Sequence, residues 1–293
     1  MLEQILQIKT PSPEQSLQFD WPNPNQCEVW VKRDDLLHPV ISGNKWRKLK
    51  YALQAIYAGQ SSQIISFGGG YSNHLHALGY CCNQLDIAFT AIVRGDYSAN
   101  MTPTLTALSD WGAKIKFVDK QTYQRRSDHD YLLELQQQYP EAVVIPEGGS
   151  QRPALSGVAD MVNELQHHYD YILLPVASGG TLAGLIHSQI NTKLIGIAVL
   201  KGQGYLEQLV KDLLSEHSPT QWQIAHHFHH GGYAKQPDEL VHFCQQSQND
   251  LNIPLEPVYS GKLFYAAREL LAEQYFPQGS RILLLHTGGL QAG

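Results

Sequence analysis

The sequence predicts an α/β protein of two domains, each built on an open, mostly parallel β-sheet. Two observations support this fold class. Short apolar runs alternate with segments whose apolar residues recur at the helical period, and glycine clusters lie at many of the junctions. Such strand–glycine–helix repetition is typical of parallel sheets with helices on both faces. No segment rich in proline, glycine and serine divides the chain, so we expect the domains to share crossover connections.

The strands are predicted from short apolar runs rich in β-branched or aromatic residues. In chain order these runs are CEVWVKRDDL (27–36), SQIISF (62–67), IAFTAIVRG (87–95), AKIKFVD (113–119), AVVIPEGG (142–149), YILLPVA (171–177), KLIGIAVL (193–200) and RILLLHTGG (281–289). Open parallel sheets bind ligands at the carboxyl ends of their strands. The polar and glycine-rich residues that follow these runs are therefore the first candidates for a site.

The helices are predicted where apolar residues recur every three or four positions between the strands. They are KWRKLKYALQAIY (45–57), SNHLHALGYCCNQL (72–85), TPTLTALSDWG (102–112), SDHDYLLELQQQY (127–139) and LAGLIHSQI (182–190).

The composition excludes several classes of function. Hydrophobic residues make up 43% of the 293 residues and charged residues 16%, which supplies a full core and is too little charge for a disordered chain. Because the net charge is −6 and no basic block occurs, we expect neither nucleic acid nor an anionic membrane as a partner. No apolar segment approaches the roughly 18 residues of a membrane span, and residues 1–15 lack the apolar run of a signal peptide.

The four cysteines form no pair of CxxC motifs. The adjacent Cys81 and Cys82 lie in an apolar stretch, which is typical of buried thiols. We therefore expect a soluble, reduced, cytoplasmic protein.

The strand at 171–177 runs through Ser178, Gly179, Gly180 and Thr181 directly into a helix. Glycines let the backbone approach a ligand, and the N–H groups at a helix start favour an anion, so this loop suits a phosphate group. It lacks the lysine of a P-loop and the GxGxxG spacing of a dinucleotide site, which favours one phosphate on a small cofactor. An ordinary tight turn explains the loop equally well, and a nucleotide diphosphate site stays a further alternative.

Two more segments combine a turn with a helix start. Three glycines precede Ser72, Asn73 and His74, where free backbone N–H groups would bind a carboxylate; a simple helix cap is the plainer interpretation. Lys45 opens a helix in SGNKWRKLKY, a position that lowers the pKa of an amine, as partial burial does. A Schiff-base lysine needs such a lowered pKa, although a surface lysine is the commoner case for this residue taken alone.

Three remaining segments are less specific. Tyr259 and Ser260 in EPVYSGK, and Thr287 in HTGG, interrupt apolar segments with polar residues. The run HHFHH (226–230) invites a metal site, but adjacent histidines on one strand point to opposite faces, and no carboxylate stands at a zinc-site spacing. We therefore expect no functional metal.

Taken in order, SGNKWRKLKY, GGGYSNH, SGGTLAG, EPVYSGK and HTGG resemble segments of pyridoxal-phosphate enzymes with the tryptophan synthase β-like fold, also called fold type II. More narrowly, they resemble the branch that contains 1-aminocyclopropane-1-carboxylate (ACC) deaminase and D-cysteine desulfhydrase. The resemblance extends from about Lys32 to the C-terminus. It implies pyridoxal 5′-phosphate in a cleft between a small domain (48–152) and a large domain (1–47 plus 153–293), and it implies a homodimer.

The resemblance also implies a role for each motif residue. Lys45 would hold the cofactor as a Schiff base and, once released, act as a general base. Ser72, with the backbone around Asn73 and His74, would bind the substrate carboxylate or assist proton transfer, and the side chain of Asn73 would hydrogen-bond the ring oxygen. Ser178, Gly179, Gly180 and Thr181 would bind the phosphate. Tyr259 would be catalytic and, with Tyr233, would line the substrate side. Ser260 and Thr287 would approach the pyridine nitrogen.

One departure distinguishes members of this branch. ACC deaminases carry a glutamate after the tyrosine of PVYxGK and read SNQ, whereas this chain has Ser260 and Ser72-Asn73-His74. A carboxylate beside the pyridine nitrogen makes the ring a deep electron sink; a hydroxyl leaves the nitrogen largely neutral, which suffices for β-elimination. We therefore expect a lyase that eliminates sulfide or a similar group from a small amino acid such as D-cysteine. ACC deamination and a non-catalytic carrier of the cofactor are the alternatives.

Overall fold

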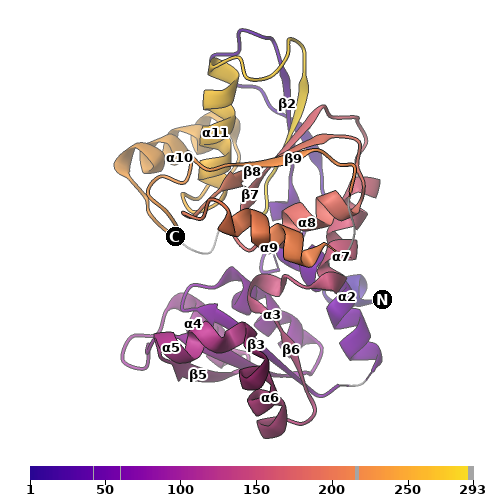
Figure 1. Ribbon diagram of the computed structural model, residues 1–293, viewed down its shortest axis with the longest axis vertical. Coiled ribbons are helices and arrows are strands. Elements are labelled where there is room, and N and C mark those ends of the chain that lie inside the picture. The colour runs from indigo at the N-terminus through magenta and orange to yellow at the C-terminus, as the bar shows by residue number, and fades with distance from the viewer. Residues whose placement is uncertain (42, 60, 215–217, 290–293) are drawn as a thin grey trace.

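The computed structural model describes residues 1–41, 43–59, 61–214 and 218–289, so Ser42 of the SGNK motif lies outside the described residues. The chain builds two parallel-stranded sheets, which lie one above the other in Figure 1. The predicted α/β class with mostly parallel sheets is confirmed.

The larger sheet combines strands from both ends of the chain. The edge strand β1 is antiparallel to β2, and the pairs β2–β10, β10–β7, β7–β8 and β8–β9 are parallel. In spatial order the strands are β1 (Glu14–Ser16), β2 (Glu28–Lys32), β10 (Arg281–Leu285), β7 (Tyr171–Val176), β8 (Lys193–Ala198) and β9 (Trp222–Ala225).

The smaller sheet uses consecutive segments of the first half of the chain, and its pairs are parallel. The register sets Gly69, at the end of one strand, beside Arg94, at the end of the next, so the following loops leave from one edge. In spatial order the strands are β5 (Lys114–Val118), β4 (Ala88–Arg94), β3 (Gln63–Gly69) and β6 (Ala142–Ile145).

The helices connect these strands. Within the described part of the chain, no helix combines the length and the apolar character needed to cross a membrane. The helices are α1 (Leu2–Ile5), α2 (Asn44–Ala58), α3 (Asn73–Gln84), α4 (Pro103–Asp110), α5 (Lys120–Gln124), α6 (His129–Gln138), α7 (Arg152–Asn163), α8 (Gly180–His187), α9 (Tyr205–Leu213), α10 (Asp238–Leu251) and α11 (Ser260–Ala272), with 3₁₀ turns η1 (Asp34–Leu36), η2 (Arg125–Ser127) and η3 (Glu147–Gly149).

The larger sheet is buried on both faces. Along β7, Tyr171 and Leu173 belong to the core that includes α10 and α11, whereas Ile172 and Leu174 belong to the core that includes α7, α8 and α9. Successive side chains of a strand point to opposite faces. A strand covered on both faces therefore appears in the sequence as a continuous apolar run, as YILLPVA does.

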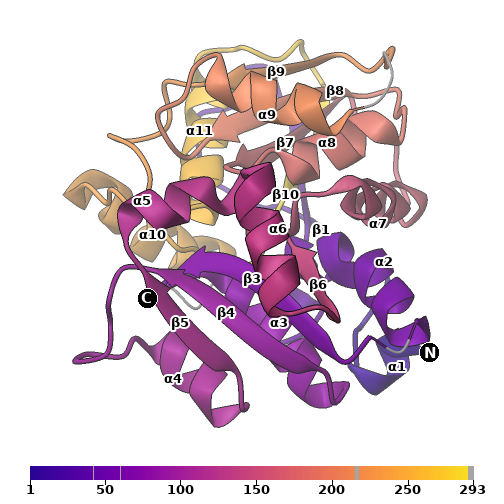
Figure 2. The same cartoon turned by 60° about the horizontal axis from the view of Figure 1, so that its bottom comes forward.

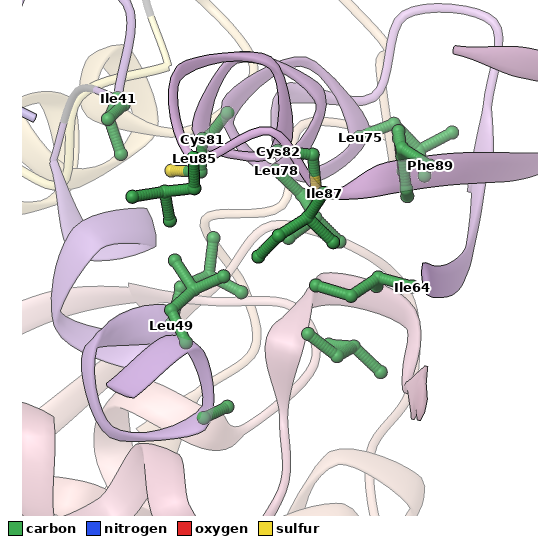
Figure 3. Close-up of a cluster of buried hydrophobic side chains, with 14 of the residues drawn as sticks. Ile41, Leu49, Ile64, Leu75, Leu78, Cys81, Cys82, Leu85, Ile87 and Phe89 are labelled. Atoms are coloured by element: carbon green, nitrogen blue, oxygen red, sulfur yellow. The ribbon is translucent and has the colours of Figure 1, made fainter. Parts of the chain in front are cut away.

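The smaller sheet is sandwiched in the same way, with α2, α3 and α4 on one face and α5 and α6 on the other (Figure 2). Figure 3 shows Leu49 of α2, Leu78 of α3 and Ile64 of β3 around one cluster of buried side chains. Cys81 and Cys82 lie in this cluster and are almost fully buried, as the sequence predicts.

The structure contradicts the prediction at several segments. The strands predicted over 142–149, 193–200 and 281–289 end at Ile145, Ala198 and Leu285, and residues 147–149 form η3. The strand predicted over 27–36 ends at Lys32, and residues 34–36 form η1 because the side chain of Asp34 is bonded to Arg47, on α2. The run 226–230 lies in a turn after β9, so the strand argument against a metal site there is wrong. Among the described residues, no group of three or more His, Cys, Asp or Glu side chains is arranged to hold a metal ion.

The domain boundaries predicted at residues 48 and 152 stay a prediction.

Several helices and strands were not predicted from the sequence. The elements without a prediction include α7, α9, β9, α10 and α11. Their helical residues mix apolar and polar side chains, so the apolar face becomes evident only against the sheet that it covers.

Candidate active site

The candidate site begins at the turn before α2, where Gly43 packs against Thr287, two residues after β10. Gly43 has φ +66°, and a Cβ there would lie 1.6 Å from the carbonyl oxygen of Thr287, so glycine alone fits. The N–H of Asn44 donates to the same oxygen at 3.2 Å. The turn therefore fixes the start of α2, with Lys45 in its first turn as predicted, against the carboxyl end of the larger sheet.

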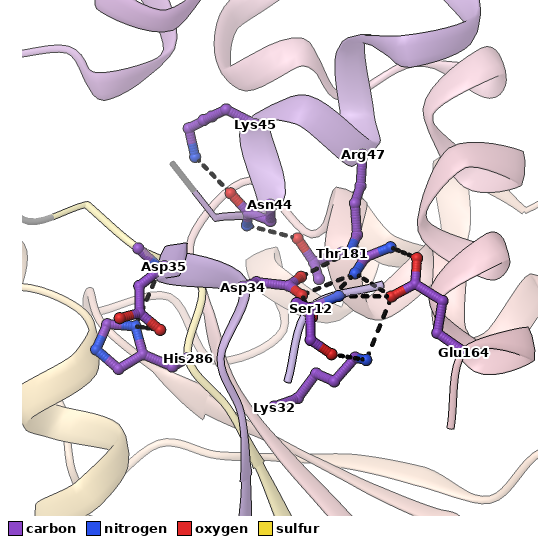
Figure 4. A network of polar contacts seen from close by, with 11 residues as sticks. Ser12, Lys32, Asp34, Asp35, Asn44, Lys45, Arg47, Glu164, Thr181 and His286 are labelled. Atoms are coloured by element: carbon purple, nitrogen blue, oxygen red, sulfur yellow. Dashed lines mark hydrogen bonds and ion pairs between the residues drawn. The ribbon is translucent and has the colours of Figure 1, made fainter. Parts of the chain in front are cut away.

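The amine of Lys45 is partly buried and held by its neighbour. Its Nζ donates to Oδ1 of Asn44 at 2.8 Å, and Nδ2 of Asn44 donates to Oγ1 of Thr181 at 2.8 Å (Figure 4). Desolvation lowers the pKa of Lys45 to about 8. An appreciable fraction of the amine is therefore neutral near neutral pH, which is the form that attacks an aldehyde.

The residues Ser178–Thr181 lead from β7 into the first turn of α8. Gly179 adopts φ +76° just before the helix, a conformation that favours glycine. The N–H groups of the first turn of α8 have no earlier helical carbonyl to bond. Together with the link from Thr181 through Asn44 to Lys45, this places an anion-binding turn beside the lysine.

A second lysine lies under this loop. Nζ of Lys48 donates to Oγ of Ser150 at 2.8 Å and to Oγ of Ser178 at 3.2 Å. A Cβ on Gly180 would lie 2.6 Å from Oγ of Ser150, so the missing side chain leaves room for the loop to approach these groups. Burial, and then the charge of Lys45, lowers the pKa of Lys48 well below its usual value. A bound dianion would oppose that shift.

Sequence reasoning missed Lys48 and Ser150. For Lys48 one signal existed: it follows Lys45 by three positions, and residues three apart lie on the same side of a helix. For Ser150 no local signal existed, because its contact with Lys48 spans 102 positions.

Ser72 and Asn73 lie at the start of α3. Oγ of Ser72 accepts from the N–H of Leu75 at 3.2 Å, so the helix-cap interpretation of this serine is confirmed. Nδ2 of Asn73 is 3.5 Å from the carbonyl oxygen of Gly289, two residues after Thr287. The capping hydroxyl and the asparagine amide thus lie where β3 of the smaller sheet leads into α3, with Asn73 facing the segment that follows β10.

The side chain of His74 is buried against the smaller sheet. Oγ of Ser66 donates to the carbonyl oxygen of Ile145 at 2.7 Å and lies 2.8 Å from Nε2 of His74. Because the serine proton is engaged, Nε2 of His74 is the donor, and Nδ1 carries the lone pair. Burial, then the charges of Lys45 and Lys48, lowers the pKa of His74 well below its usual value, so the imidazole is neutral.

Two tyrosines meet on the other side of the site. The hydroxyls of Tyr233, in the loop after β9, and Tyr259, just before α11, are 3.1 Å apart. Burial, then Tyr233, raises the pKa of Tyr259 well above its usual value. Both facts favour a protonated hydroxyl that can donate to a substrate atom.

The buried carboxyl group of Glu256 lies next to Ser260. Oγ of Ser260 accepts from the N–H of Glu256 at 2.9 Å and lies 3.3 Å from Oε1 of Glu256. The carboxylate accepts the N–H groups of Val258, Tyr259 and Ser260 at 2.7–2.8 Å and so caps α11. Desolvation raises the pKa of Glu256 to about 7 although these bonds lower it. Sequence reasoning missed Glu256 because the interpretation of EPVYSGK rests on Ser260, the residue after the tyrosine, and not on the glutamate that begins the motif.

The ionisation of Glu256 is expected to make stability depend on pH. Its pKa is raised from 4.5 to about 7 in the folded state, so the folded protein binds more protons between these values than the unfolded chain. The free energy of unfolding should therefore fall by roughly 3 kcal/mol as pH rises from below 4.5 to above 7. Urea unfolding of wild type and Glu256→Gln at several pH values would measure this, and a difference between the two proteins that does not change with pH would contradict it.

The segment that follows β10 lies close to groups on both sides of the site. A Cβ on Gly289 would lie 3.2 Å from Nδ2 of Asn73 and 3.6 Å from Cδ2 of Tyr259. The carbonyl of Thr287 contacts the N–H of Asn44, next to Lys45. Motif residues from both halves of the chain therefore surround one region.

The residues present fit pyridoxal phosphate. The desolvated amine of Lys45 suits its aldehyde, and the glycine turn at Gly179 with the ammonium of Lys48 suits its phosphate. Gly180 lacks the side chain that would fill the space beside Lys48. The donor set offers at one end the amine of Lys48, which a bound phosphate would keep protonated, and hydroxyl and amide groups elsewhere, as this cofactor requires.

Comparisons with known proteins agree with this fit. A sequence model of the family described as "Pyridoxal-phosphate dependent enzyme" matches residues 15–288. The bifunctional D-cysteine desulfhydrase/1-aminocyclopropane-1-carboxylate deaminase of Arabidopsis thaliana is 28% identical to the chain, over 91% of the chain and 73% of that protein. The D-cysteine desulfhydrase of Salmonella typhi is 23% identical, over 90% of the chain and 88% of that protein.

The fold is also similar to solved structures. The crystal structure of an ACC deaminase homologue superimposes with a TM-score of 0.80 at 25% identity, and the match covers 99% of the chain and 95% of that structure. The cofactor and the fold that the sequence motifs predict are confirmed by these similarities.

Proposed function

Because the chain belongs to the family of pyridoxal-phosphate dependent enzymes, we propose that it is a lyase that removes a β-substituent from a small amino acid. With D-cysteine the products would be sulfide, ammonia and an α-keto acid. The observation that carries the proposal is the chain of contacts from the amine of Lys45 through Asn44 to Thr181 of the phosphate loop. The desulfhydrase names of the relatives support the substrate class.

Lys45 is proposed to form the covalent bond to the cofactor and to remove the α-proton of the substrate. When bound, pyridoxal phosphate supplies a conjugated electron sink that acidifies the α-carbon of an attached amino acid. The Nζ of Lys45 would hold the cofactor's aldehyde carbon and, once free, take the α-proton, for which a pKa of about 8 is well matched. Oδ1 of Asn44 accepts a hydrogen bond from Nζ and thereby orients the lone pair of the neutral amine.

Other residues would bind and orient the cofactor and the substrate. Lys48 and the residues Ser178, Gly179, Gly180 and Thr181 are proposed to hold the phosphate, and Ser260 and Thr287 to face the ring nitrogen. Asn73 would bond the ring oxygen. The substrate would lie among Ser72, Asn73, Tyr233 and Tyr259, with its carboxylate at the backbone N–H groups of Asn73 and His74, because the side chain of His74 is buried against Ser66. A tyrosine proton would be available to the departing group.

ACC deamination is a second candidate. The buried carboxyl of Glu256 lies 3.3 Å from Oγ of Ser260, so a carboxyl group stands close to this position although the motif lacks the glutamate of ACC deaminases. That carboxyl favours ring opening more than Ser260 alone does. The relative from Arabidopsis thaliana carries both activities in its name.

Titration with four amino acids tests the proposal. The purified protein, loaded with pyridoxal phosphate, would receive D-cysteine, L-cysteine, L-cysteate or ACC while visible absorbance, sulfide, sulfite and α-keto acids are measured. We expect D-cysteine to change the absorbance of the bound cofactor and to release sulfide. Release of 2-oxobutyrate from ACC would favour the second candidate, and bound cofactor that responds to no amino acid would favour a non-catalytic carrier.

We also propose a cytoplasmic homodimer with a small domain of residues 48–152 and a large domain of residues 1–47 plus 153–293. The two separate sheets, one of residues 63–145 and one from both ends of the chain, support this division. Sedimentation of the purified protein would report the oligomeric state.

A further inference from the structure

A buried lysine that takes no part in the proposed chemistry lies in α11, three residues after Tyr259. Lys262 has no exposed surface. Its Nζ donates to the carbonyl oxygens of Val199, just after β8, at 3.0 Å and of Gly232, in the loop after β9, at 2.8 Å. Burying an ammonium group is unfavourable unless it is hydrogen-bonded, so these two contacts define where the side chain can lie.

The loop that Lys262 contacts has an unusual backbone. Positive φ values occur at His230 (+50°), Gly231 (+91°), Gly232 (+123°) and Ala234 (+54°). Two of these residues are not glycine, and residues with a Cβ rarely adopt such values. The surrounding structure must therefore hold the loop in place. The carbonyl of Gly232 accepts both from Lys262 and from the N–H of Lys235, at 3.2 Å.

Both tyrosines are attached directly to the segments that Lys262 joins. Tyr233 follows Gly232, and Tyr259 precedes the helix that carries Lys262. Their hydroxyls are 3.1 Å apart although Tyr233 is half exposed. We propose that Lys262 is a positioning residue that holds Tyr233 against Tyr259. The effect on catalysis rests on the proposed function, in which these tyrosines line the substrate side.

The contacts depend on hydrogen bonds more than on charge. Both acceptors of Lys262 are neutral carbonyls, and desolvation lowers the pKa of the amine to about 8, an effect that Glu256 opposes. The neutral amine still carries two N–H groups, one for each carbonyl. Methionine has a similar length and no N–H donor, so Lys262→Met removes both bonds at once.

Amide hydrogen exchange tests the positioning without any turnover. In wild type, the N–H groups of Gly231, Gly232 and Lys235 are hydrogen-bonded, so we expect protection within 231–235. Lys262→Met should raise exchange there by about tenfold or more. Lys32→Met is the control: Lys32 is equally buried, but it donates to the carbonyl of Ser12 and pairs with Glu164 at 3.2 Å, both outside this loop. Under conditions in which the variant is folded, its loss should leave exchange at 231–235 unchanged.

A double-mutant cycle tests the link to catalysis. Lys262→Met and Tyr233→Phe should each lower kcat/KM for the active amino acid by about 10- to 100-fold, and the double variant should be little worse than either. Additive losses, or wild-type exchange at 231–235 in Lys262→Met, would refute the proposal. If Lys262→Met does not fold, Lys262→Gln, which keeps a shorter donor, takes its place in both measurements. If no amino acid is turned over, the exchange result still decides the positioning role.

Discussion

Replacement of Lys45 by alanine is expected to abolish covalent attachment of pyridoxal phosphate and to lower turnover by about 10³-fold or more. The variant loses both the nucleophile that holds the cofactor and the proposed base for the α-proton, and a positioned acid–base group alone contributes roughly 10²- to 10⁴-fold. Reduction with borohydride followed by mass spectrometry would detect the attached cofactor in wild type and its absence in the variant.

Lys50→Ala is the matched control for that experiment. Lys50 lies on the same helix, and its Nζ forms ion pairs with Asp160 at 2.7 Å and with Glu3 at 3.4 Å on the surface. Its loss should leave cofactor attachment intact. Wild-type turnover by Lys45→Ala would contradict the role of Lys45, and loss of attachment in both variants would point to damage of α2 in general.

Replacement of Arg47 by methionine is expected to lower the free energy of unfolding by about 3–5 kcal/mol. Arg47 donates from Nε and Nη2 to both oxygens of Asp34, at 2.7 and 2.8 Å, and from Nη1 and Nη2 to Glu164, at 2.9 Å (Figure 4). Asp34 is fully buried, so removal of the guanidinium leaves a charge in the interior with too few partners. Breaking one side of a buried ion pair typically costs this amount.

Urea unfolding would measure the effect of Arg47→Met, with Arg125→Met as its control. Arg125 pairs with Glu134 at 2.9 Å in solvent, and exposed pairs contribute little, so its loss should leave the midpoint unchanged. Because Arg47 lies two residues after Lys45, we also expect weaker cofactor binding in Arg47→Met at concentrations of urea that leave wild type loaded. Equal effects of the two substitutions would show that the buried network does not hold α2.

Features whose physical causes are local can be predicted from the sequence. The strands other than β1 and β9 follow from apolar runs, since a strand covered on both faces needs apolar residues throughout. The glycines of SGNK and SGGT follow from backbone conformations or close approaches that a Cβ would prevent, as at Gly43 and Gly179. Lys45 in the first turn of α2 and Ser72 as a cap are likewise properties of a few neighbouring residues.

Features that depend on partners distant in the sequence became evident from the fold alone. Asp34 leaves the predicted strand because its partner is Arg47, which in turn pairs with Glu164, 117 residues further along the chain. Lys48 acquires its place through Ser150 and Ser178, and Lys262 through Val199 and Gly232. Hydrogen bonds and ion pairs between such groups depend on distance in space, which a local pattern of residues does not contain. The sequence therefore predicts candidate residues for the chemistry, and the fold shows which other residues contact them and hold them in place.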